Sequence, residues 1–205
     1  MKDVFVNYIG HGTVQFLMLG FVVSVSGVAY LELWAYWPWL LLVVASAPLY
    51  EWVTHKYVLH GDLTKRAGAY RDFQIRLHHG HHLEPNNIEL QFAPTLAIVI
   101  MFLQLYLFYA LVTWSLQAAI MPLAGSLAYY LVYEWIHLAH HQSSYAPITK
   151  AGQSLREAHM RHHFHNENYN WGITNGLGDM ILGTWKSVKD VPKSPTAKNL
   201  SNYDG

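Results

Sequence analysis

Residues 90–133 read LQFAPTLAIVIMFLQLYLFYALVTWSLQAAIMPLAGSLAYYLVY, and these 44 residues contain no Asp, Glu, Lys or Arg. A helix of about 20 apolar residues crosses a bilayer, so this segment is long enough for two spans. Two further uncharged runs, 4–31 and 33–50, precede it. The pattern predicts an all-α membrane protein with four transmembrane helices, near residues 13–32, 35–54, 92–113 and 116–136.

The basic residues predict the orientation of these spans. All thirteen Lys and Arg lie at Lys2, between Lys56 and Arg76, or from Lys150 onward, and none lies in either expected inter-helix turn. Because basic loop residues favour the cytoplasmic side of a membrane, both hairpins should enter from the cytoplasm. The alternative is a soluble all-helical protein with very apolar core helices, but such a protein would not need this uneven distribution of Lys and Arg. We expect one integral-membrane domain over residues 1–205, with a cytosolic helical cap over 55–90 and 137–190 and a tail over 191–205.

Ten of the fourteen histidines fall into four short motifs, HxxxxH, HxxHH, HxxxH and HxxHH in chain order. Spacings of three and four residues place side chains on one face of a helix. A neutral imidazole is a common metal ligand. The motifs therefore predict metal binding by His55, His60, His78, His81, His82, His137, His141, His159, His162 and His163.

The chain looks like two copies of one unit, because Tyr50-Glu51-Trp52 and Tyr133-Glu134-Trp135 each precede a two-histidine and then a three-histidine motif. Each unit supplies five imidazoles, and ten are more than one ion can bind, so two metals are expected. His55 and His60 lie about 140° apart on a regular α-helix. Either the helix ends or distorts there, or these two residues serve different metals.

Other polar residues are candidates to support the ligands. We expect Glu51 and Glu134 to ligate metal or to hydrogen-bond a ligating imidazole, the alternative being carboxylates that reach water at the membrane surface. His79 and His140 adjoin ligands and are candidates for the same supporting role. Asp179 is expected to accept a hydrogen bond from an imidazole, or else to cap the turn of residues 176–179.

Aromatic residues near the expected cytoplasmic ends of the spans are candidates to line a substrate tunnel, although helix packing explains such residues equally well. They are Trp52, Tyr129, Tyr130 and Trp135.

The composition narrows the chemistry. The absence of cysteine excludes thiolate-bound zinc, iron–sulfur clusters and a haem-thiolate centre within this chain. Zero formal net charge and the lack of a basic-aromatic stripe give no reason to expect nucleic acid as a partner. Imidazole ligands suit both iron and zinc, but only iron could change valence and react with O2. Redox chemistry at this site would need electrons from outside the chain.

With these motifs in order, the sequence resembles the fatty acid hydroxylase and sterol desaturase superfamily over about residues 50–185. The segment His78-His79-Gly80-His81-His82, followed by Pro85, is similar to the fatty acid 2-hydroxylase branch, as is Trp171-Gly172-Ile173-Thr174 after the last motif. Asn87 stands where that branch has an aspartate. The fused cytochrome b5 domain of many eukaryotic members is not expected here.

The resemblance implies an O2-dependent enzyme with two iron ions, where zinc can replace iron in purified protein. It also implies a lipid substrate, hydroxylation at C-2 of a fatty acid or ceramide-type acyl chain, and electrons from a separate cytochrome b5- or ferredoxin-type reductase system. Sterol or carotenoid hydroxylases and desaturases of the same superfamily are the alternatives. A membrane metal transporter or sensor is the non-catalytic alternative, although the expected spans lack charge at mid-depth. The bacterial inner membrane is favoured as the location, or the endoplasmic reticulum for a eukaryotic source.

Overall fold

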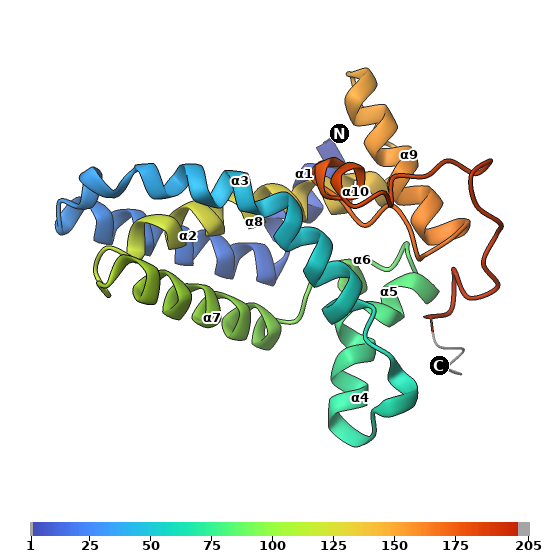
Figure 1. The fold of residues 1–205 in the computed structure, drawn as a ribbon, viewed down its shortest axis with the longest axis horizontal. Helices are drawn as coiled ribbons and strands as arrows, with labels where there is room; N and C mark the ends of the chain where they lie inside the picture. The colour runs from blue at the N-terminus through green and yellow to red at the C-terminus, as the bar shows by residue number, and fades with distance from the viewer. Residues whose placement is uncertain (1, 201–205) are drawn as a thin grey trace. The chain divides into compact units, whose positions relative to one another are not determined.

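The computed structural model describes residues 2–200, and this part of the chain is helical without a β-strand (Figure 1). The expected all-α class is therefore confirmed. The chain divides into two compact units, each described by itself. We call them the apolar unit, Lys2–Ala47 with Pro94–Trp135, and the histidine unit, Pro48–Ala93 with the described residues from Ile136 onward.

The apolar unit contains the long helices of the fold and two shorter elements. They are α1 (Lys2–Gly10), α2 (Gly12–Tyr30), η1 (Leu33–Tyr36), the first part of α3 (Pro38–Val53), α7 (Thr95–Thr113) and most of α8 (Ile120–His141). The helices α2, α3, α7 and α8 pack against one another (Figure 1). At Gly125 of α8 a Cβ atom would lie 2.6 Å from Cδ2 of Leu40, so a larger residue there would require the Leu40 side chain of α3 to shift.

Three stretches of helix are long and apolar enough to cross a membrane: Gly12–Tyr30, Leu33–Leu59 and Ile88–Thr113. Only 11% of the most apolar window in the third is buried by the rest of the protein, and its mean hydropathy is 2.3. A helix that is apolar on all sides and remains uncovered by protein is suited to lipid. These stretches correspond to the first three expected spans, which supports an integral membrane protein.

The fourth expected span, near 116–136, forms α8, which begins later at Ile120 and continues to His141. It is not among the stretches that meet the length and hydropathy of a span within residues 2–200. Tyrosines, Glu134 and His137 interrupt its apolar residues. Its crossing of a membrane therefore stays a prediction.

The histidine unit is built from short helices and turns. Its elements are the end of α3, η2 (Thr54–Leu59), η3 (Leu63–Lys65), α4 (Gly68–Gln74), η4 (Ile75–His79), α5 (Gly80–Leu83), α6 (Ile88–Gln91), the end of α8, α9 (Lys150–Phe164) and α10 (Leu177–Ile181). Both η2 and η4 are π-helical, a form found mostly as single turns at functional sites. Both carry predicted ligands.

Candidate metal centre

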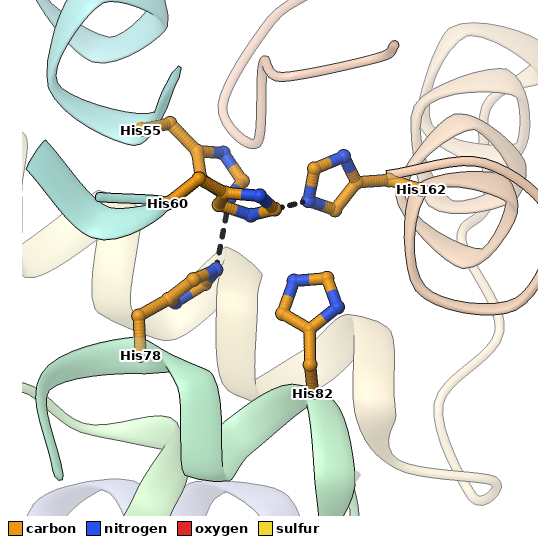
Figure 2. Close-up of side chains that lie close together, drawn as sticks. All are labelled: His55, His60, His78, His82 and His162. Atoms are coloured by element: carbon orange, nitrogen blue, oxygen red, sulfur yellow. Dashed lines mark hydrogen bonds between the residues drawn. The ribbon is translucent and has the colours of Figure 1, made fainter. Parts of the chain in front are cut away.

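The ten predicted ligands form two groups of five imidazoles. Within each group, one ring nitrogen of every histidine lies within 4.8 Å of the others. The first cluster contains His55, His60, His78, His82 and His162. The second cluster contains His81, His137, His141, His159 and His163. Figure 2 shows the rings of the first cluster directed toward a common centre from three separate parts of the chain.

The two clusters do not follow the two sequence units. His81 comes from the first unit but lies in the second cluster, and His162 comes from the second unit but lies in the first cluster. Both are the middle histidine of an HxxHH motif. Successive residues on a helix point about 100° apart, so the middle histidine is directed away from its neighbour. Each cluster again contains five imidazoles, but His81 and His162 are exchanged relative to the two sequence units.

The clusters adjoin each other. The rings of His82 and His163, one from each cluster, stack with centroids 4.1 Å apart and an interplanar angle of 22°.

The irregular spacing of His55 and His60 is resolved by a distorted helix. In η2 the amide of His60 donates to the carbonyl oxygen of His55 at 3.0 Å, which is the i→i+5 bond of a π-turn. The wider turn brings residues five apart onto one face, and the ring centroids lie 5.0 Å apart. Of the two expectations, distortion is confirmed, because both residues belong to the first cluster.

The distances between ring nitrogens fit ligands around an ion. In the first cluster the Nε2 atoms of His55 and His78, and those of His60 and His162, are 3.1 Å apart. In the second cluster Nε2–Nε2 distances are 3.0 Å for His81 with His137, 3.1 Å for His81 with His141 and 2.8 Å for His141 with His159. Two ligands at right angles, each about 2.0–2.1 Å from one ion, would lie about 2.8–3.0 Å apart.

Backbone carbonyls orient four of these imidazoles. Each carbonyl oxygen can only accept, so the facing ring nitrogen, Nδ1, must donate its proton, which leaves Nε2 with a lone pair for a metal. The pairs are His55 with Trp171 (2.6 Å), His162 with Tyr169 (2.8 Å), His82 with Ala197 (3.0 Å) and His137 with Gln91 (3.0 Å). The sequence could not identify these partners, because a backbone carbonyl has no residue signature.

The protonation state also favours metal binding. Burial lowers the pKa of His82 to about 3 and that of His137 to about 4, and it lowers those of His78, His81, His159, His162 and His163 well below the usual value. Near neutral pH these rings are therefore neutral.

Among the described residues neither ring nitrogen of His163 has a hydrogen-bond partner, and the same holds for Nε2 of His82. Buried polar atoms without partners are costly, and an ion at each cluster would satisfy one ring nitrogen of each of these histidines. Five nitrogens leave one further position on a six-coordinate ion.

The turn Trp171–Thr174, which carries the carbonyl partner of His55, is held by two buried carboxylates. Asp179 accepts from the amides of Trp171 and Gly172 at 3.0 and 2.7 Å and from the Thr184 hydroxyl at 2.6 Å. Glu51 accepts from the amides of residues 173 and 174 and from the hydroxyl of Thr174. Both carboxylates therefore hold the turn that orients a ligand, one step further from the ligand than the sequence predicts.

The remaining supporting candidates lie outside the two clusters. His79 is 1% exposed, and burial lowers its pKa. The ring of His140 lies 5.5 Å from that of His159, and its pKa is lowered by burial to about 3. Glu134 is 1% exposed and belongs to the apolar unit. Support of the ligands by these three residues stays a prediction.

The four candidates for a substrate tunnel are partly engaged in packing. The indole N–H of Trp52 donates to the Thr184 hydroxyl at 2.8 Å, and Tyr130 stacks on Tyr133 with centroids 5.2 Å apart. Trp135 lines an open groove of about 320 Å³ with Phe5, Tyr8, Leu131 and Val132. Tyr129 lies beside Tyr130 on α8. A role in substrate binding stays a prediction for all four.

The fold and the two clusters define a class of protein: a helical membrane protein whose buried histidines can hold two metal ions. Residues 39–184 match the family model described as fatty acid hydroxylase, and the chain belongs to that family. The expected resemblance is thereby confirmed.

Curated relatives and a solved structure agree with the family. The chain is 30% identical over 142 residues, 68% of its length, to dihydroceramide fatty acyl 2-hydroxylase FAH1 of Arabidopsis thaliana, and 32% identical over 162 residues, 76% of its length, to FAH2 of the same plant. It spans 57% and 65% of those two proteins. The structure of full-length Scs7p, in which only the hydroxylase domain is visible, matches with a TM-score of 0.70 and 22% identity over 88% of this chain and 66% of that one. This last likeness concerns the fold.

Proposed function

We propose that this protein is an O2-dependent hydroxylase that places a hydroxyl group on C-2 of a fatty acyl chain, as a free fatty acid or in a ceramide-type lipid. The observation that carries the proposal is the pair of five-imidazole clusters in a chain of the fatty acid hydroxylase family. The named activity of FAH1 and FAH2 supports the position and the class of substrate.

The two clusters would each hold one iron ion through neutral imidazole nitrogens. Iron bound there would supply the reduction and activation of O2, which zinc with its fixed valence could not supply. In the overall reaction one oxygen atom of O2 enters a C–H bond, and the other leaves as water with two electrons and two protons. Because this chain has no cysteine to bind an iron–sulfur cluster, the electrons would come from a separate cytochrome b5- or ferredoxin-type reductase system.

This chain's own residues prepare the site in three ways. The carbonyls of Trp171, Tyr169, Ala197 and Gln91 fix the imidazoles with Nε2 free, so the ligands need no rearrangement to bind metal. Burial keeps the imidazoles unprotonated near neutral pH and keeps bulk water away. Lipid-suited helices in the same chain would let an acyl substrate arrive from the bilayer.

For the topology, we propose four spans with α8 as the fourth and with the histidine unit on the cytoplasmic side. The support is the distribution of basic residues, since no Lys or Arg occurs from Glu89 to Thr149, a stretch that includes α7 and α8. The membrane would be the inner membrane in a bacterium or the endoplasmic reticulum in a eukaryote.

The test is to purify the protein from iron-supplemented cells, to count metals per chain, and to supply O2, a reductase system and C16–C24 acyl lipids. The expected result is two metals per chain and a 2-hydroxy acyl product heavier by one oxygen atom. His159→Ala and His163→Ala should abolish the product, whereas His11→Ala, which changes a histidine outside both clusters, should retain it.

One metal per chain, or product formation that survives both cluster substitutions, would overturn the two-metal hydroxylase. A hydroxylated or desaturated sterol or carotenoid in place of the acyl product would keep the chemistry but replace the substrate. Metal movement across vesicles without any oxidised lipid would favour a transporter.

A further inference from the structure

The segment from Val191 to Leu200 comes after α10 and lies beyond the residues matched by the family model, which end at 184. We call it the C-terminal strap. Its first part is hydrogen-bonded to the residues just after α9. His165 donates from Nε2 to the carbonyl oxygen of Val191 at 2.9 Å, Asn166 donates to that of Pro192 at 2.9 Å, and the amide of Ser194 donates to that of His165 at 2.8 Å.

A buried carboxylate holds the middle of the strap. Glu167 is 6% exposed, and its Oε1 accepts hydrogen bonds from the hydroxyls of Ser194, at 2.9 Å, and Thr196. Hydrogen bonds to an ionised acceptor are stronger than those between neutral groups. The carboxylate thus ties two strap residues to the segment that follows α9.

The end of the strap contacts the first cluster. The carbonyl oxygen of Ala197 accepts the Nδ1 proton of His82 at 3.0 Å, and Ala197 itself is 2% exposed. Leu200 is also buried. The strap therefore reaches His82 of the first cluster through the backbone of Ala197.

Along its outer side the strap is not closely packed. An open pocket of about 480 Å³ is lined by strap residues 193–195, 197 and 198 and by Phe164. The hydroxyls of Ser194 and Thr196 hydrogen-bond to Glu167 in this part of the strap.

We propose that the C-terminal strap is a positioning element that retains the metal of the first cluster, with Glu167 as the latch that keeps the strap in place. This inference rests on the two-metal centre proposed above. When the strap is displaced, the Nδ1 proton of His82 loses its acceptor, and the ring is no longer fixed with Nε2 toward the cluster.

The effect is specific to one cluster. In the second cluster, the ring of His137 is oriented by the carbonyl of Gln91, which belongs to α6 and not to the strap. His55 and His162 of the first cluster keep their carbonyl partners, so this cluster is weakened and not abolished.

The experiment measures metal release from the full-length protein. A latch variant, Ser194→Ala with Thr196→Val, removes both hydroxyl donors to Glu167, and Ala197→Asp places a charge at the buried end of the strap. The matched control, Ser187→Ala, removes a hydroxyl in an exposed turn of the same region, where it accepts from the amide of Lys189. Each protein is loaded with Zn²⁺ and mixed with an excess of a chromogenic chelator, and the unfolding midpoint of the metal-free form is measured in parallel.

Loss of a group that orients a ligand typically weakens metal binding about 10–100-fold. In the latch variant and in Ala197→Asp, we expect one of the two Zn²⁺ ions to leave faster by a factor in that range and the other to leave at the wild-type rate. In the control Ser187→Ala, both ions should leave at the wild-type rate. Wild-type release of both ions from both strap variants would overturn the proposal. Equal acceleration of both ions with a lowered midpoint of the metal-free form would also overturn it, because the strap would then stabilise the fold in general. Failure of the two-metal centre itself would show in the wild-type protein, as fewer than two ions bound.

Discussion

The exchange of His81 and His162 between the two clusters can be tested by counting metals in paired variants. His162→Ala removes one of five nitrogens from the first cluster. Structural zinc sites bind with about 10–16 kcal/mol over four ligands, so one imidazole contributes about 2.5–4 kcal/mol, or two to three orders of magnitude in Kd. We expect His162→Ala to retain one metal firmly and to lose the other on gel filtration in the presence of a weak chelator.

The second substitution then reports which cluster was weakened. His162→Ala combined with His55→Ala changes the same cluster twice and should still retain one metal. His162→Ala combined with His137→Ala weakens both clusters and should retain none. The assay is metal per chain by elemental analysis, with folding checked by circular dichroism.

If the clusters instead followed the two sequence units, the two pairs would give the opposite counts, and that result would refute the exchange. The reciprocal set based on His81→Ala, paired with His141→Ala or with His78→Ala, should retain one metal in the first case and none in the second.

Two further predictions concern the metal-free protein. Burial holds the pKa of His82 at about 3, below its value of about 6.5 in an unfolded chain. The unfolded state therefore takes up protons first as the pH falls. The free energy of unfolding should be highest above pH 6.5 and should decline below it, by up to about 1.4 kcal/mol per pH unit for each such histidine. A denaturation midpoint that stays constant or rises between pH 7.5 and pH 5 would contradict this. Gly178→Ala should destabilise the histidine unit by roughly 1–3 kcal/mol, since the new Cβ would lie 2.6 Å from the carbonyl oxygen of Pro48. Thermal unfolding should show no comparable loss for Gly10→Ala, whose Cβ would meet no atom within 4 Å.

Much of the fold followed from local sequence. The uncharged runs predicted helices suited to a membrane, and the first three of these have counterparts in the structure. The tyrosines and Glu134 of α8 lower its apolar character, so the sequence pattern that predicts its span is weaker than the others. A distorted helix at His55 was one of two expectations, because the five-residue spacing does not fit a regular helix.

Support of the ligands was harder to predict, for a physical reason. Asp179 and Glu51 were recognised as supporting carboxylates, but they bind backbone amides of residues 171–174 and not the imidazoles themselves. The imidazole partners are backbone carbonyls, which every residue possesses. Only the path of the chain decides which carbonyl faces which ring.

The sequence by itself predicted the ten histidines as candidate ligands and determined much of the helical frame, because both depend on residue identity and on spacings of three to five residues. The tertiary structure decided how the ten histidines divide. His81 and His162 are exchanged between clusters since adjacent helical positions point in different directions, and which partners they meet depends on the packing of segments far apart in the chain. The C-terminal strap shows the same dependence, because its contact with His82 joins residues 115 positions apart.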